Sequence, residues 1–208
     1  MSTHLDIVGS IILAGMLMLS IARFNTDRQA ALMTASNTST IQMQMESATT
    51  LLLFDLRKAG HRVTSGNAFL VCEPRRLVFR GDLENDGRVD TITYIWRGAV
   101  AYTPNPRDTL LWRSVNATSA MSSTSTAGSG SDLGICALRF RYYDKNNVET
   151  ATIANVKTVR ISIRVESRFP TQLDDQFQEG FDEVDVNDRT AFQQFTSEIR
   201  ITPRNVNP

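Results

Sequence analysis

The chain has 208 residues, enough for one compact domain of ordinary size plus an extension. Its 22 basic residues balance its 22 acidic residues, and the basic residues occur singly rather than in a long stripe with interleaved aromatics. This composition argues against nucleic-acid binding, which needs a basic surface. The two cysteines and two histidines are too few and too far apart for a zinc site or a Cys–His nucleophile.

The first predicted element is an apolar helix within residues 1–24. Residues 7–22 are mostly apolar, but this run of about 16 is shorter than the roughly 20 residues that cross a bilayer core without tilt. No basic residue precedes the run and no good cleavage site follows it, so it does not read as a removable signal peptide. Length and hydropathy alone indicate a lone membrane anchor. Small residues of the kind that let helices approach closely are also present: Gly9, Ser10, Ala14 and Gly15.

Residues 25–60 continue the helix with an amphipathic pattern. They contain no proline, and apolar residues recur at roughly helical spacing between Ala30 and Leu56. The run TASNTSTIQ at residues 34–42 is rich in weak helix formers and predicts a bend or a frayed stretch. Gly60 predicts a left-handed C-terminal cap. A helix over residues 5–59 would be roughly 80 Å long. A head of about 150 residues cannot cover that length, so one half must protrude.

Residues 61–208 predict a β-rich globular head, because seven short runs are rich in β-branched and aromatic residues. The run KTVRISIRVES over residues 157–167 alternates most clearly and predicts an antiparallel strand with one wet face, resting on a helix. Its apolar face holds Val159, Ile161, Ile163 and Val165, and its polar face holds Arg160, Ser162, Arg164 and Glu166. The seven runs are 68–73, 76–81, 91–96, 110–115, 135–143, 156–167 and 196–202.

Two stretches of the head lack this texture. Residues 117–132 are rich in serine, threonine and glycine and predict a mobile loop, and residues 169–189 are acidic and irregular. The chain as a whole therefore predicts an α+β fold. A long N-terminal helix, apolar in its first half and amphipathic in its second, packs on a C-terminal antiparallel sheet.

Four stretches in order carry a family resemblance. They are the helix end LLLFDLRKAGHR, the acidic FRGDLENDGRVDTITYIW, the pair LRFRYYDKNN and VKTVRISIRVES, and the closing SEIRITPRNVNP. Together they resemble type IV pilin-like proteins, in particular the larger minor pilins (PilW-like) and the J-type pseudopilins. The resemblance implies a structural subunit, not an enzyme, of a type IV pilus-like or type II secretion-like filament. Its implied partners are other pilin-like subunits, and the membrane before assembly.

The start of the chain differs from the family pattern. Typical precursors carry a basic leader ending in glycine, followed by Phe-Thr-Leu-Ile-Glu, and no such leader is seen here. Without Met1, however, the chain begins Ser-Thr-His-Leu-Asp, which sets Thr3 and Asp6 where the family has threonine and glutamate. In the family, this acid meets the terminal amine of a neighbouring subunit. The resemblance thus assigns assembly roles to Ser2, Asp6, Gly9, Ala14 and Gly15.

The physical reason for that pairing is the cost of a carboxylate alone in hydrocarbon, which is several kcal/mol. The alternative is that Asp6 lies in the headgroup layer or caps the helix. Arg23 and Arg28 follow the apolar run, and charge alone would place the N-terminus outside the cell. The resemblance implies the opposite orientation, which we adopt. The head then lies outside the cytoplasm, first anchored to the inner membrane and later in an extracellular or periplasmic filament.

The acidic stretch also partly matches a calcium-binding loop, in which alternate oxygens converge on the ion. Its acids are Asp82, Glu84, Asp86 and Asp90. Thr93 stands where such a loop needs a glutamate, and the expected flanking elements are strands rather than helices. We therefore favour a plain hairpin turn with Asp86 and Gly87 at positive φ.

The remaining candidates point away from catalysis. Cys72 and Cys136 lie on expected strands, where a disulfide and two free buried thiols are equal alternatives. No Ser–His–Asp grouping and no phosphate-binding glycine loop is found, so the sequence predicts neither a catalytic site nor a small-molecule substrate. The alternative function is a membrane-anchored accessory or binding subunit of a larger cell-envelope complex.

Overall fold

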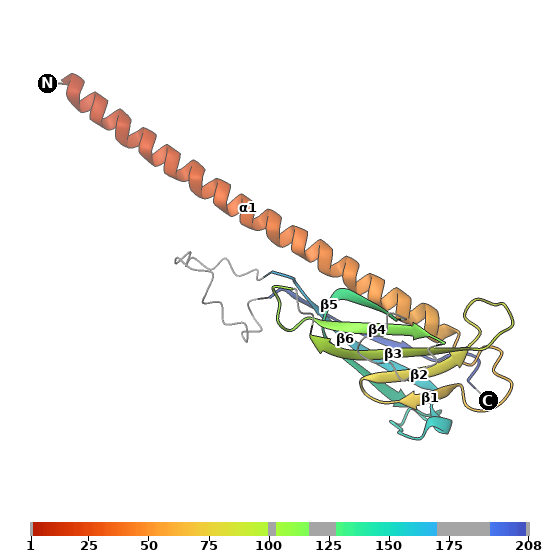
Figure 1. The fold of residues 1–208 in the computed structure, drawn as a ribbon. Helices are drawn as coiled ribbons and strands as arrows, with labels where there is room; N and C mark the ends of the chain where they lie inside the picture. The colour runs from red at the N-terminus through yellow and green to blue at the C-terminus, as the bar shows by residue number, and fades with distance from the viewer. Residues whose placement is uncertain (1, 100–102, 117–127, 170–191, 207–208) are drawn as a thin grey trace.

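The computed structural model describes residues 2–99, 103–116, 128–169 and 192–206. They form one long helix and one seven-stranded antiparallel sheet, whose strands follow one another in chain order (Figure 1). The predicted α+β fold is thereby confirmed, and each of the seven strand predictions coincides with a strand. The elements are α1 (Ser2–Arg57), β1 (Phe69–Cys72), β2 (Arg76–Gly81), β3 (Asp90–Ala99), β4 (Thr109–Val115), β5 (Gly128–Tyr143), a 3-10 turn (Ile153–Asn155), β6 (Thr158–Glu166) and β7 (Gln194–Ile201).

Helix α1 runs without interruption for 56 residues, or roughly 84 Å. The expectation of a bend or frayed stretch at residues 34–42 is wrong, because every residue there is helical. The hydroxyls of Thr34, Thr38 and Thr40 each donate to the carbonyl four residues earlier, at 2.8–3.0 Å. Such bonds satisfy the hydroxyls within the helix, and their slight weakening of a helix is not enough to interrupt this one.

The helix ends at Arg57, two residues before the predicted end at Ala59, and the predicted left-handed glycine follows. Gly60 has φ +78° and its N–H donates to the carbonyl of Arg80 on β2 at 2.8 Å. A Cβ at this position would lie 2.3 Å from the carbonyl oxygen of Asn205. Glycine is therefore required twice, for the left-handed backbone and for the close approach of the C-terminal segment.

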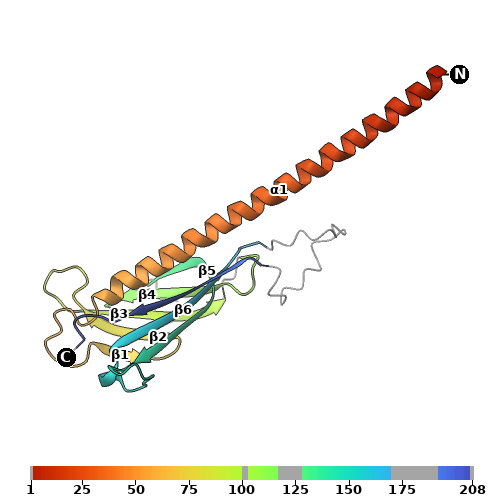
Figure 2. The ribbon, with the colours of Figure 1, turned by 180° about the vertical axis from the view of Figure 1, so that it is seen from behind.

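Only the rear of α1 is covered by the sheet. A stripe at spacings of three and four residues is buried there, and it consists of Ile41, Met45, Ala48, Leu52 and Leu56. This stripe packs into one core with the inner face of the sheet, where α1 lies against β5, β6 and β7. The first half of α1 extends away from the head, as both views show (Figures 1 and 2).

The sheet differs from the sequence prediction at two points. Strand β5 begins at Gly128, so residues 128–131 of the predicted loop pair with β4, while residues 117–127 lie outside the described part. The acidic stretch from residue 170 onward also lies outside it. On β6 the apolar face is buried as predicted, but Glu166, assigned to the wet face, is only 1% exposed. The segment over residues 103–108 covers this end of β6, as described below.

A buried ion pair fixes α1 to the sheet. The carboxylate of Asp55 is fully buried and accepts hydrogen bonds from the Tyr94 hydroxyl at 2.5 Å and from Arg113 Nε at 2.6 Å. Tyr94 on β3 and Arg113 on β4 are direct cross-strand partners. Burial and the Asp55 charge raise the pKa of Tyr94, and the hydrogen bond to Asp55 raises the pKa of Arg113. The tyrosine thus stays neutral and the arginine charged.

We expect Asp55→Ala to destabilise the head by about 3 kcal/mol, because it leaves a partly buried guanidinium and a buried hydroxyl without an acceptor. The measurement is urea unfolding of the detergent-solubilised chain, followed by the fluorescence of Trp96 and Trp112. Glu46→Ala, an exposed acid on the same helix, is the control and should change little. Equal stability of the two variants would contradict this account of the ion pair.

Candidate functional site

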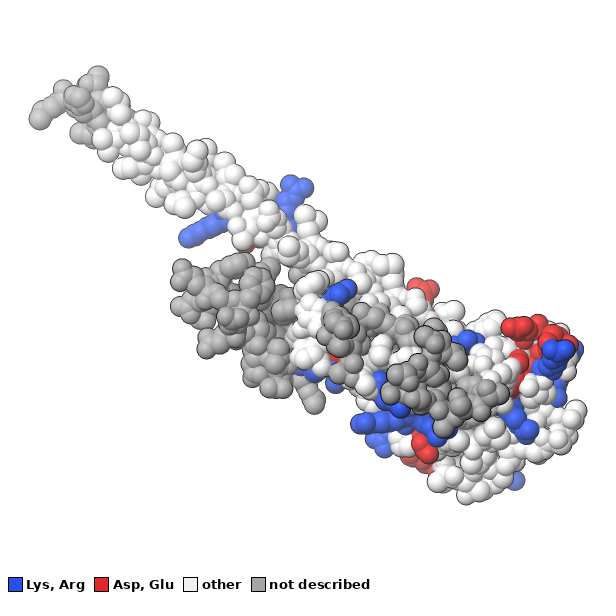
Figure 3. All heavy atoms as spheres, in the orientation of Figure 1, with Lys and Arg blue, Asp and Glu red and all other residues white. Residues whose placement is uncertain are grey.

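The first half of α1 is an apolar rod with no cover. Within the described chain its large side chains are 52–75% exposed, where a core helix would bury one face. These are Ile7, Val8, Ile11, Ile12, Leu13, Met16, Leu17, Met18, Leu19, Ile21 and Phe24. In Figure 3 the rod is almost free of charged side chains until the first basic groups at about one third of its length. In the sequence, the first charged residues after Asp6 are Arg23, Asp27 and Arg28.

Three hydroxyl groups in this half are satisfied within the helix itself. The hydroxyls of Ser10, Ser20 and Thr26 donate to carbonyls three or four residues earlier, at 2.8–3.0 Å. Helical backbone groups are likewise paired within the segment. A helix that needs no water for its polar groups suits an apolar environment.

The glycines of the rod have no packing role within the chain. A Cβ on Gly9 or Gly15 would meet no atom within 4 Å, in contrast to Gly60. Glycine in a helix interior costs about 1 kcal/mol relative to alanine, and nothing in this chain offsets that cost. A closely packed neighbouring helix would supply the reason for them. Gly9 and Gly15 lie about 120° apart around the axis, with Ala14 beside Gly15, so they do not line a single face.

An exposed apolar stripe continues along α1 at the level of the head. Met43 and Phe54 are 58% and 55% exposed, on the side of the helix that faces away from the sheet. With Leu51 and the polar residues Glu46, Ser47 and Thr50 they border a shallow hollow of about 590 Å³. The rear of α1 therefore has an apolar face buried in the head and, on the opposite side, two exposed apolar side chains among polar neighbours.

The acidic loop between β2 and β3 is organised by Asp82. Its buried carboxylate accepts from Arg62 Nη1 at 2.9 Å and from the backbone N–H groups of Asp86 and Gly87 at 3.2 and 3.0 Å. Burial acts to raise the pKa of Asp82, but the Gly87 N–H, the Arg62 charge and the remaining backbone donors outweigh it and hold that pKa below its ordinary value.

The other acids of this loop are spread apart. Asp90 accepts from the backbone N–H of Leu83 at 3.0 Å and from Asn116 Nδ2 at 2.7 Å, while Glu84 and Asp86 are exposed. No group of three or more ligating side chains gathers anywhere in the described residues. The turn itself differs from the prediction, since positive φ occurs at Asn85 and Gly87 and not at Asp86. The Asp82 carboxylate draws the loop around itself, which a two-residue turn would not allow.

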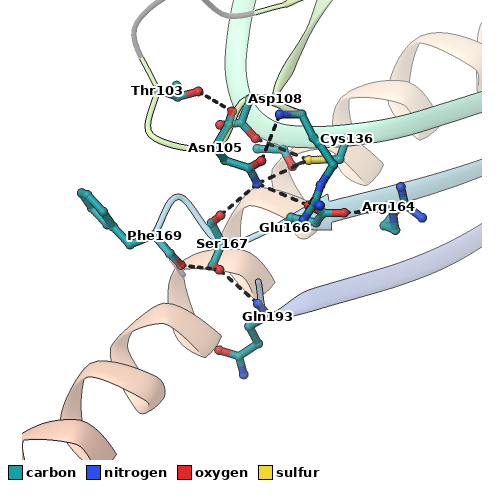
Figure 4. A network of polar contacts seen from close by, with 11 residues as sticks. Thr103, Asn105, Asp108, Cys136, Arg164, Glu166, Ser167, Phe169 and Gln193 are labelled. Carbon is teal, nitrogen blue, oxygen red and sulfur yellow. Dashed lines mark hydrogen bonds and ion pairs between the residues drawn. The ribbon is translucent and has the colours of Figure 1, made fainter. Parts of the chain in front are cut away.

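A second polar cluster was missed from the sequence (Figure 4). Glu166 accepts from Arg107 Nε at 2.8 Å and from Asn105 Nδ2 at 3.3 Å, and forms an ion pair with Arg164 at 3.2 Å. These contacts tie the segment before β4 to the end of β6. In the sequence, the only indication of this cluster is an acid, Glu166, on an otherwise regular strand. Its partners Asn105 and Arg107 lie about 60 residues away in the sequence.

Both cysteines are free thiols in the structure, and both are half-buried. Burial raises the pKa of Cys72 to about 12. Burial and the nearby charges of Glu166 and Asp108 raise the pKa of Cys136 further, and its Sγ donates to Asp108 Oδ1 at 3.5 Å. Neither thiol is poised as a nucleophile, because the thiolate is the reactive form.

The described residues contain one helix, near the N-terminus, that is long and apolar enough to cross a membrane, as an anchor or a signal sequence would. Comparison of the chain with models of protein families, with curated proteins and with solved structures finds no match. The exposed rod is therefore the feature from which a function is inferred.

The thiols give one prediction. At pH 8, a thiol-reactive dye should modify Cys72 and Cys136 in the folded chain at least about 100-fold more slowly than in the chain unfolded in urea, because so little thiolate is present. Mass spectrometry after timed alkylation measures both sites separately. Rapid modification of the folded chain would show that the thiols are not protected in this way.

The acidic loop between β2 and β3 gives another testable prediction. A carboxyl with a lowered folded pKa stabilises the fold at pH values above about 4, its unfolded pKa, and that contribution is lost as pH falls through the lowered value. Asp82→Asn should therefore lower Tm at pH 7, and the difference from the natural chain should shrink on acidification to about pH 2. Glu84→Gln serves as the control, since its side chain is exposed. A difference in Tm that does not vary with pH would argue against the proposed role of the Asp82 charge.

Proposed function

We propose that the chain is a structural subunit of a type IV pilus-like or type II secretion-like filament, which assembles through its N-terminal helix. The observation that supports this most strongly is the uncovered apolar rod joined rigidly to a folded head. Burying each large apolar side chain contributes about 1.5–3 kcal/mol. The rod therefore needs an apolar environment, first a membrane and then the helices of neighbouring subunits.

Packing among helices also accounts for the short apolar run. A lone anchor should match the thickness of the bilayer core, whereas helices that bury one another need not. The two glycines without intrachain contacts fit this arrangement, because they permit close approach of a neighbouring helix.

The alternative, a membrane-anchored accessory subunit of a cell-envelope complex, explains the apolar first half equally well. The stripe at the level of the head favours the filament. Phe54 lies 30 residues beyond Phe24, or about 45 Å along the helix, which is too far to share the same bilayer core. A partner helix that runs alongside α1 would cover both segments.

Asp6 is the residue whose role separates assembly from simple anchoring. Its carboxylate is exposed at the start of the apolar run, with no ion-pair partner among the described residues. Within a helix bundle it would need a cation, and the terminal amine of an adjacent subunit supplies one. This pairing would also fix the axial step between subunits.

We expect Asp6→Ala to abolish recovery of the chain in sheared surface filaments, while the head keeps its Tm. Asp6→Glu should retain assembly, and Asp27→Ala, an acid beyond the apolar run, is the matched control. Immunoblots of the sheared and membrane fractions measure the distribution. Filaments containing normal amounts of the Asp6→Ala chain would refute the pairing. A natural chain that is found only in a detergent-stable membrane complex would favour the alternative function.

A further inference from the structure

Exposed apolar side chains recur every 11 residues along one face of α1. Eleven residues make about three turns, so residues at this spacing differ by only about 20° around the helix axis. Large apolar residues that are 52–61% exposed occupy four successive positions of this series: Ile21, Leu32, Met43 and Phe54. The whole row turns by about 60°. It therefore stays on one face of the helix from the apolar rod to the level of the head.

Two opposite charges repeat the same spacing. Between residues 29 and 57 of α1, the exposed charged residues are Glu46 and Arg57, since Asp55 is buried. Glu46 follows Met43 by three residues and Arg57 follows Phe54 by three, which sets both charges about 60° to the same side of the row. Within the described part of the chain, neither forms an ion pair.

Each of these charges lacks an opposite charge beside it. Arg57 borders a hollow of about 640 Å³ together with Arg200 and Arg204, and no acid is among the described residues that line it. Glu46 borders the hollow beside Met43, whose described lining contains no basic residue. Each residue would therefore be stabilised by the opposite charge of a partner.

A second copy of α1 supplies both the apolar cover and the charges at a single displacement. In two parallel helices displaced by 11 residues, or about 16 Å, Phe54 of one copy is level with Met43 of the other, and Met43 with Leu32. The same displacement sets Arg57 of one copy level with Glu46 of the other. We propose that two copies of the chain pack along this face at this displacement, a contact that rests on the proposed function for its parallel orientation.

Other occupants of this face fit the observations less well. A lipid headgroup is excluded because Arg57 lies about 50 Å beyond the apolar run. A free anion would neutralise Arg57 but leave Phe54 uncovered. An antiparallel copy could also pair Glu46 with Arg57, but it would set Phe54 level with Thr49 and point the two apolar rods in opposite directions.

The proposed arrangement leaves space for both heads. Met43 lies about 180° around the axis from the buried Leu52, so the shared face is opposite to the sheet and the two heads lie on opposite sides of the pair (Figures 1 and 2). The residues between the large ones of the row include small ones, which permit the usual separation of about 8–10 Å between helix axes: Ser36, Ser39, Ser47 and Thr50.

This contact is separate from the pairing of Asp6 with a terminal amine. Asp6 is only four residues from Ser2, so that pairing needs a displacement of about 6 Å. The two contacts therefore involve different neighbours of one subunit.

Cysteine cross-linking measures the displacement. Two tagged forms of the full chain are produced in the same cells, one with Ser39→Cys and the other with Thr50→Cys. These exposed positions are 11 residues apart on the shared face, so the proposed contact brings them level and within reach of a short bismaleimide. The matched control carries Ser39→Cys in both forms, whose thiols would be about 16 Å apart along the axis. Chains without an introduced cysteine give the background from Cys72 and Cys136. Membranes and sheared filaments are analysed separately.

The expected result is a cross-linked dimer of the two forms, at least about tenfold more abundant than the control product. Arg57→Glu should lower its yield at least about threefold, because two acids then face each other in place of an ion pair. Combining Arg57→Glu with Glu46→Arg should restore the yield, since the two charges are merely exchanged. Arg88→Glu, in the exposed loop before β3, is the control for charge reversal and should change nothing.

Absence of the dimer from both fractions, an equal yield from the Ser39→Cys control, or a yield that Arg57→Glu does not change would overturn the proposed contact. Filaments that contain the chain but no dimer would remove the contact and leave the proposed function in place. A dimer found in membranes, with no chain in filaments, would keep the contact and contradict the proposed function.

Discussion

The burial of the Asp55 carboxylate determines how α1 packs on the sheet. An ionised carboxylate is stable in a protein interior only where cationic or hydrogen-bonding partners surround it. For Asp55 those partners are Tyr94 and Arg113, which face each other on adjacent strands. A helix shifted by one residue would turn Asp55 by about 100° and remove it from both. The contact therefore fixes the rotation and axial position of α1, and with them the stripe from Ile41 to Leu56 that completes the core.

With its C-terminal half fixed to the sheet, the N-terminal half of α1 is covered by no other described part of the chain. The same helix then has to meet two environments, a core of its own making and an apolar medium supplied from outside. Its composition suits both, because six hydroxyls between Ser10 and Thr40 are satisfied by the helix backbone. Met43 and Phe54 are also exposed, so α1 needs a covering partner at the level of the head as well. The assembly of parallel helices that we propose would supply this cover at both levels.

The face of the sheet away from α1 has a different chemistry. There the buried groups are ionic, with Glu166 joining the segment before β4 to the end of β6. Beside this cluster lies a groove across β5 and β6 that is lined by Arg75, Arg139 and Arg164, and the cluster and the groove share Arg164. Each side of the head thus offers a distinct kind of contact, apolar along the helix and charged across the strands.

Much of this could be predicted from the sequence. The strands, the length of α1 and the cap at Gly60 depend on alternation, helical spacing and left-handed backbone, which are properties of neighbouring residues. The partners of Asp55, the burial of Glu166 and the meeting of the Pro74 turn with β5 could not be predicted, because each joins groups that are 39 to 66 residues apart. Local pattern set the elements, and tertiary packing decided which polar groups left the water, since burial of a charge depends on partners that only the folded chain brings near.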